Sequence, residues 1–178
     1  TPDNGVCAAL YSASEVAVKV GDGTMVRFAA ETHYPFEDTI RFRFSADKAV
    51  TFPLYLRLPA WCQSPQVSVN DVETKVAAGG KYIRIEREWK NGDVVTLRLP
   101  MEISVRKWTR NHDSVSVNYG PLTFSLKIGE RYDRHDSIKT AIGDSSWQKV
   151  ADTTKWPSHE IHPTTPWNYG LVLDEPNP

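Results

Sequence analysis

Histidines are the first residues of this chain whose type and spacing could do chemistry. His33 lies within Glu31–Phe36, where its neighbours could support acid–base catalysis. A catalytic histidine needs a positioned partner, and the segment offers none, so we interpret His33 as a strand-end residue. His159 and His162 have a spacing that can bind a metal in a loop. No third ligand accompanies them, so the sequence does not favour a metal site.

A charged cluster near the middle of the second half is the next candidate. Asp133, His135 and Asp136 lie within four consecutive residues. Covalent catalysis would need a nucleophile at a recognisable turn, and this segment has none. We interpret these side chains as a solvated loop, and we expect the chain to hold no catalytic residue.

The chain has two cysteines, Cys7 and Cys62. Cys7 lies in the apolar run Val6–Leu10, where a buried free thiol is the usual arrangement. Cys62 follows Trp61 in a predicted turn. A single pair leaves both a disulfide and two free thiols open, and the absence of a Cys-x-x-Cys spacing gives no support to a metal site.

Aromatic side chains give the strongest indication of binding. The chain has six tryptophans and seven tyrosines. Indole rings near turns can stack on the apolar face of a sugar, or they can close the end of a core or contact a neighbouring domain. The candidates for a carbohydrate or interdomain contact are Trp61, Trp108, Trp156 and Trp167.

Composition excludes several classes of function. With 178 residues, 40% of them hydrophobic and 24% charged, the chain can form one soluble domain with a sizeable core. A formal net charge of -1 does not provide the basic surface that nucleic acids require. No apolar run has the length of a membrane span. The first residue is not methionine, and we interpret the chain as a piece of a longer protein whose export signal lies outside it.

Alternating apolar and polar residues indicate β-strands along most of the chain. The pattern is clearest between Phe52 and Pro100, where every second residue is apolar in three successive segments. Gly21–Gly23 and Lys90–Asp93 have the composition of hairpin turns. About ten short strands at this spacing predict an all-β, antiparallel, two-sheet β-sandwich, jelly-roll-like in type. On this register the buried residues include Leu56, Leu97 and Phe124, and the exposed ones include Arg57, Arg98 and Lys127.

The character of the sequence changes after Gly129. Residues 130–166 are polar and have no regular period, and Tyr169–Asp174 resembles one last strand. We therefore predict a β-sandwich core over residues 1–129 and a long irregular C-terminal extension over residues 130–178, within the same domain. A long irregular segment in a compact domain is uncommon, so we expect it to pack on another part of the parent protein.

Several segments, taken in order, resemble one known family. The chain is similar to the β-sandwich region that follows the helical barrel in β-L-arabinofuranosidase-type glycoside hydrolases, a family 127-like group. The similarity covers nearly the whole chain. The segments that carry it are Glu31–Phe36, Leu54–Trp61, Val67–Asp71, Gly80–Trp89, Gly92–Met101, Tyr119–Leu122 and Pro166–Leu171.

The resemblance implies that catalysis occurs elsewhere in the parent protein. In that family the active site lies in an (α/α)6 barrel, where a zinc-bound cysteine thiolate is thought to attack the sugar. The corresponding residues lie upstream of the sandwich, and neither Cys7 nor Cys62 has the matching context. The resemblance therefore implies no catalytic residue, cofactor or metal in this chain, and zinc in the barrel of the parent.

We predict that this chain alone is not an enzyme but an accessory domain of a glycan-degrading glycoside hydrolase. The expected parent is extracellular or periplasmic. The expected partners are its helical barrel, a second copy in a homodimer, and a plant-type oligosaccharide; neither nucleic acid nor membrane is expected. The alternatives are a free-standing carbohydrate-binding module and a catalytic domain in its own right. Aligned aromatics in a groove would favour the module, and a large exposed apolar face would favour the accessory domain.

Overall fold

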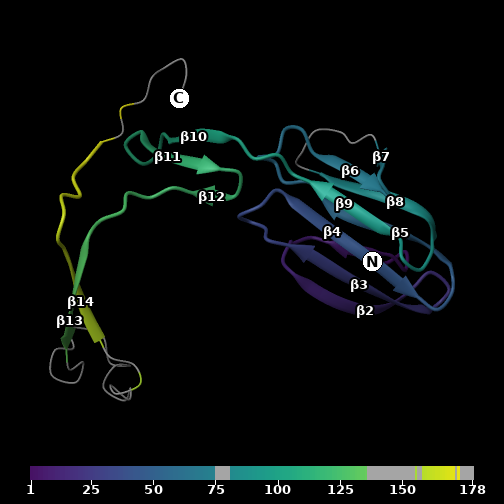
Figure 1. Cartoon of the computed structure of the whole chain (residues 1–178). Helices are drawn as coiled ribbons and strands as arrows, with labels where there is room; N and C mark the ends of the chain where they lie inside the picture. Colours follow the sequence, from purple (N-terminus) through teal and green to yellow (C-terminus); the bar gives the residue numbers. More distant parts are fainter. Residues whose placement is uncertain (75–80, 136–154, 156–157, 171, 173–178) are drawn as a thin grey trace. The chain divides into compact units, whose positions relative to one another are not determined.

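The structure, a computed structural model, describes residues 1–74, 81–135, 155, 158–170 and 172. All regular elements within these ranges are β-strands (Figure 1). None of the described residues belongs to a helix long and apolar enough to cross a membrane. The chain divides into two compact units, Thr1–Phe124 and Ser125–Pro178.

Two sheets form the larger part of the first unit. The first sheet has six strands in the order β2-β3-β4-β9-β6-β7, and the second has three strands in the order β1-β5-β8. All their pairings are antiparallel except that of β1 with β5, which is parallel. The six strands are β2 (Ser14–Val20), β3 (Thr24–Thr32), β4 (Thr39–Ala46), β9 (Val94–Arg98), β6 (Gln66–Val69) and β7 (Val72–Thr74). The three strands are β1 (Val6–Ala8), β5 (Val50–Arg57) and β8 (Tyr82–Trp89).

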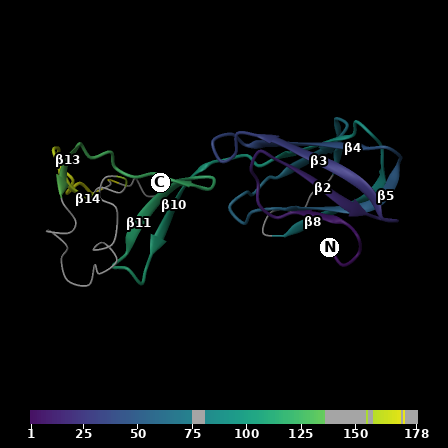
Figure 2. The same ribbon diagram turned by 90° about the horizontal axis from the view of Figure 1, so that it is seen from below.

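A shared core joins the two sheets into a β-sandwich, as predicted. Figure 2 shows β3 and β4 in one layer and β8 in the other. Between the layers, the Phe28 ring of β3 meets the Phe52 ring of β5 edge to face at 5.9 Å. The Phe44 ring of β4 lies 6.3 Å from the ring of Trp89 in β8. The buried Trp89 Nε1 donates to the Phe52 carbonyl at 3.0 Å, so this large side chain enters the core without leaving a polar group unpaired.

The predicted alternation holds within the sandwich. Leu56 and Leu97 are both 0% exposed, while Arg57 and Arg98 are exposed. Side chains alternate between the two faces of a strand, so a buried leucine indicates that the residues next to it along the strand face solvent. The inward positions of β4, β5 and β9 therefore follow directly from the sequence pattern.

The two predicted turns have different outcomes. The Gly21–Gly23 hairpin is confirmed, because β2 pairs with β3 on either side of it. The Lys90–Asp93 hairpin is wrong: β8 pairs with β5, whereas β9 pairs with β4 and β6, so this turn carries the chain from one sheet to the other. An Asn-Gly turn reverses the chain tightly in either case, and its residues do not determine whether the next strand returns to the same sheet.

A smaller antiparallel sheet follows the sandwich in the first unit. Its strands are β10 (Ile103–Trp108), β11 (Ser114–Tyr119) and β12 (Leu122–Thr123). The predicted strand Leu122–Ile128 ends at Thr123, and Phe124 is 57% exposed, so its predicted burial is wrong. Alternation marks an apolar face, but burial also requires a second layer, and none of the described residues buries Phe124. Lys127 is exposed, as expected.

The second unit contains regular structure that the sequence did not indicate. Strands β13 (Glu130–His135) and β14 (Ser158–Pro163) pair antiparallel, so the irregular extension predicted from residue 130 is wrong for these two segments. These strands were not predicted because they contain few apolar residues, and period-two alternation is visible only when one face is mostly apolar. The predicted strand Tyr169–Asp174 is wrong for its described residues, which are not in a strand, and the rest lies outside them. The domain boundary predicted at residue 129 stays a prediction.

Candidate functional site

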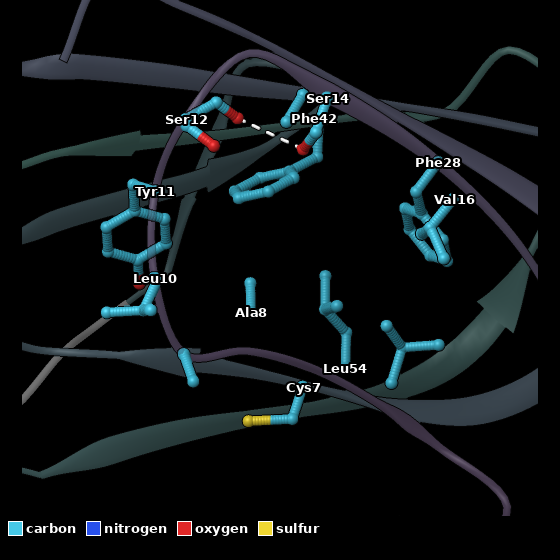
Figure 3. Close-up of a pocket in the computed structure, with 13 residues that line it drawn as sticks. Cys7, Ala8, Leu10, Tyr11, Ser12, Ser14, Val16, Phe28, Phe42 and Leu54 are labelled. Atoms are coloured by element: carbon cyan, nitrogen blue, oxygen red, sulfur yellow. Dashed lines mark hydrogen bonds between the residues drawn. The ribbon is translucent and has the colours of Figure 1, made fainter. Parts of the chain in front are cut away.

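A cavity of about 390 Å³ opens beside the segment that leaves β1 (Figure 3). Side chains from both sheets line it, together with the connection from β1 to β2. The lining is mostly apolar, and its polar groups include the hydroxyls of Tyr11, Ser12 and Ser14. Ser14 Oγ donates to the Ser12 carbonyl at 3.1 Å. No carboxylate or histidine is among the residues that line the cavity, so its chemistry suits binding rather than acid–base catalysis.

A second groove, of about 420 Å³, shares the segment Ala9–Tyr11 with this cavity. Tyr34, Arg57 and Trp61 also line it. These side chains come from positions just after β3, at the end of β5 and in the loop that follows β5. The ends of strands from both sheets therefore bring aromatic residues together that are far apart in the sequence. We refer to this site as the aromatic groove.

Ring contacts fix the side chains of the aromatic groove. The rings of Tyr11 and Tyr34 meet edge to face at 5.9 Å, and the ring of Tyr11 lies 6.2 Å from that of the buried Phe42. The Tyr11 hydroxyl donates to the Arg57 carbonyl. Trp61 is half-buried and packs against the core. The groove is thus held by the core of the sandwich rather than by a free loop.

Both tyrosine hydroxyls of the aromatic groove are protonated at neutral pH. Burial raises the pKa of Tyr11 far above its usual range, against the opposing effect of the Arg57 guanidinium. Burial also raises the pKa of Tyr34, again with Arg57 acting in the opposite direction. Neutral hydroxyls can donate and accept hydrogen bonds, but they are poor nucleophiles.

Neither Trp108 nor Trp167 is among the residues that line the aromatic groove. Trp108 lies in β10, where the Arg106 guanidinium stands 3.6 Å from the ring centroid and Nε1 donates to Ser116 Oγ at 3.1 Å. Trp167 belongs to the second unit, is 63% exposed and borders a hollow of about 400 Å³. Trp156 lies outside the described residues. The carbohydrate or interdomain contacts predicted for these four tryptophans stay predictions.

The histidine candidates show no metal site. His159 and His162 are three residues apart in β14, so they point to opposite faces of the strand and cannot share one ion. His162 Nε2 lies 3.3 Å from Asp133 Oδ2, a cross-strand pairing that sequence analysis missed because β13 and β14 were not recognised. His33 is exposed. Within the described ranges, no group of three histidine, cysteine or acidic side chains is placed to hold a metal.

Both cysteines are free thiols in this structure. Cys7 is exposed, so its predicted burial is wrong. Cys7 is exposed because β1 turns Val6 and Ala8 toward the core, which leaves the residue between them on the outer face. Cys62 is buried, and burial raises the pKa of its thiol. A buried thiol with a raised pKa is a packing residue rather than a nucleophile.

The comparisons with known proteins identify the family. The sequence profile of the β-L-arabinofuranosidase GH127 middle domain matches residues 5–101, which is more than half of the chain. The chain therefore belongs to this family of middle domains. The matched range contains the whole sandwich and ends before β10. No curated protein matches the chain.

Solved structures have a similar fold. A glycoside hydrolase matches 66% of the chain at 29% identity with a TM-score of 0.60. The GH127 β-L-arabinofuranosidase Ara127N from Geobacillus stearothermophilus T6 matches 90% of the chain at 22% identity with a TM-score of 0.63. The GH127 β-arabinofuranosidase BT3674 matches 79% at 22% identity, also with a TM-score of 0.63. The chain spans only 20%, 30% and 27% of the lengths of these three proteins.

Proposed function

We propose that this chain is a non-catalytic accessory domain of a glycan-degrading glycoside hydrolase of the β-L-arabinofuranosidase type. The observation that carries the proposal is the match of residues 5–101 to the middle domain of that family. The parent is a secreted enzyme, extracellular or periplasmic, and the sugar is cleaved in its helical barrel, where zinc would be held.

The chemistry of the two cavities beside β1 supports a non-catalytic role. Most glycosidases use a pair of carboxylates on either side of the scissile bond. Neither the cavity of Figure 3 nor the aromatic groove has a carboxylate among its lining residues. Cleavage by way of a zinc-bound thiolate would need a cluster of ligands, and the described residues include none.

Exposed apolar side chains of the second unit support a docking role. Ile161 of β14 and Trp167 are 57% and 63% exposed, and both border the same hollow, with Glu130 as its charged residue. Tyr132 and Tyr169 are also more than half exposed. A two-stranded hairpin is marginally stable by itself, so this unit gains most from a partner that covers these residues. We assign that partner to the barrel of the parent or to a second subunit.

The docking role can be tested by comparing the parent enzyme with the isolated chain. The double substitution Ile161→Ser and Trp167→Ser removes apolar surface that is already exposed in the chain. We expect a lower unfolding temperature for the parent and little change for the chain, measured by calorimetry. Val72→Ser, at a residue that is 69% exposed in β7 of the sandwich, is the matched control and should change neither. An unchanged transition in the doubly substituted parent would rule out this surface as the docking contact.

A further inference from the structure

The aromatic groove has an unpaired cation beside its rings. Among the described residues, arginines with a carboxylate partner within 4 Å include Arg27, Arg43, Arg84, Arg87, Arg98 and Arg131. The guanidinium of Arg57 has no hydrogen bond or ion pair with any residue that the structure describes, although its backbone carbonyl accepts the Tyr11 hydroxyl. The Arg57 guanidinium therefore offers five N–H donors in a fixed planar geometry at the wall of the groove.

The remaining walls of the groove are aromatic and fixed. Trp61, Tyr34 and Tyr11 line the groove, and each packs against the core cluster. Rigid aromatic side chains offer contact area at little entropic cost, because their rotamers are already restricted before a ligand binds. The volume of about 420 Å³ falls within the range of small-molecule sites, in which apolar walls are combined with a few polar groups.

We propose that the aromatic groove binds one sugar ring of an oligosaccharide. The apolar face of the ring would lie on Trp61 and the tyrosines, and its oxygen atoms would accept hydrogen bonds from the Arg57 guanidinium and the Tyr34 hydroxyl. The same guanidinium can bond to a pair of adjacent hydroxyls or, bidentately, to a uronate carboxylate. The chemistry required of the ligand is thus one apolar face and a pair of neighbouring oxygen acceptors. With no carboxylate among the lining residues, the site holds the sugar without cleaving it.

Binding can be measured on the full 178-residue chain by two-dimensional NMR, with the Trp61 indole N–H as a local reporter. Two probes separate the sources of the ligand: an arabinotriose, which is neutral, and a digalacturonate, which is acidic. We expect saturable shifts of the Trp61 signal with at least one probe. If Arg57 bonds a carboxylate, the digalacturonate should bind more tightly and its affinity should fall as salt rises.

Substitutions test whether the sugar probes bind in the aromatic groove. Arg57→Ala changes an exposed side chain and should weaken the affinity about tenfold or more, as expected for loss of a hydrogen bond from a charged donor. Trp61→Ala should abolish binding, and its thermal transition reports whether the fold survives. Trp108→Ala and Arg41→Ala, which change an exposed tryptophan and an exposed arginine away from the groove, are the matched controls and should leave the affinity unchanged.

The proposal is overturned if neither probe gives a saturable shift, or if Arg57→Ala binds as tightly as the unchanged chain. It does not depend on the accessory role, because the measurement uses the chain alone. Sugar binding could fail while the parent still loses stability on substitution of Ile161 and Trp167, and the reverse result is equally distinguishable.

Discussion

At the scale of single residues, the turn between the two sheets depends on Asp93. This carboxylate is 8% exposed, accepts the Lys90 backbone N–H at 2.9 Å and accepts Asn70 Nδ2 at 2.8 Å. Asn70 Oδ1 in turn accepts the Val94 backbone N–H at 2.8 Å. Burial raises the pKa of Asp93, but these hydrogen bonds and the nearby Arg87 outweigh burial and hold it below the ordinary value. One acidic side chain therefore links the loop after β6 to the crossing between sheets.

Stability should depend on the ionisation of Asp93. The pKa of Asp93 is lower in the folded protein than in the unfolded one. The ionised carboxylate therefore adds to the free energy of unfolding above the unfolded pKa of about 3.9, and this contribution is lost as the pH falls below that value. Asp93→Asn should lower the free energy of unfolding by about 1–3 kcal/mol at pH 7, since a charged acceptor is lost. The difference between the two proteins, measured by urea denaturation, should shrink as the pH falls below this unfolded value. An equal loss from the exposed control Asp47→Asn would contradict this role.

Core packing at Leu97 gives a second prediction at the residue scale. Leu97 is 0% exposed in β9, at the centre of the six-stranded sheet. Leu97→Ala should cost about 2–5 kcal/mol, by loss of burial and formation of a cavity. The exposed Val72→Ala should change stability by less than about 0.5 kcal/mol. A denaturant midpoint that Leu97→Ala leaves unchanged would show that the register of β9 is wrong.

At the scale of elements, strand positions could be predicted more fully than strand partners. The alternation of Ile40, Phe42 and Phe44 located β4 and its inner face, because burial on one side leaves a period of two in the sequence. The same rule failed at Phe124, where alternation continues beyond the strand. It could not find the pairing of β13 with β14, because each strand has too few apolar residues to show a period of two. Pairing is set by contacts between distant segments, which a local pattern does not contain.

The aromatic groove was predictable only in part, for the same reason. Trp61 was a candidate because a tryptophan near a turn can serve in binding. Tyr11, Tyr34 and Arg57 were not, since nothing in their local sequence distinguishes them from other strand-end residues. They become neighbours only when β3 and β5 are placed in facing sheets. A pairing of aromatic and basic residues near strand ends is the weak signal that the sequence contains.

The turn at Gly92 provides a prediction for the connection between sheets. Gly92 has a φ of +88°, and a Cβ there would meet no atom within 4 Å. Gly92→Ala should therefore destabilise through backbone strain alone, by about 1 kcal/mol or more. Gly170 also has open space but does not have a positive φ in this range, so Gly170→Ala is the matched control. If thermal unfolding gave equal transition temperatures for both variants, strain at this turn would be excluded.

At the scale of the whole molecule, the two units should differ in local stability. The sandwich has a continuous core between two sheets, whereas the described part of the second unit pairs only β13 with β14 and leaves both mainly exposed. In hydrogen exchange, amides of Glu130–His135 should exchange much faster than those of Val94–Arg98, because local opening of a two-stranded hairpin costs little. Equal protection in the isolated chain would mean that the second unit is self-sufficient and would argue against the docking role.

The absence of catalysis in the chain itself is the central claim, and an activity assay tests it most directly. The isolated 178-residue chain and its parent enzyme would be compared on the same aryl β-L-arabinofuranoside at equal molar concentration, with zinc supplied. The account predicts turnover by the parent and none above the buffer blank by the chain. Turnover by the chain that survives repurification and follows the protein peak through a sizing column would contradict it.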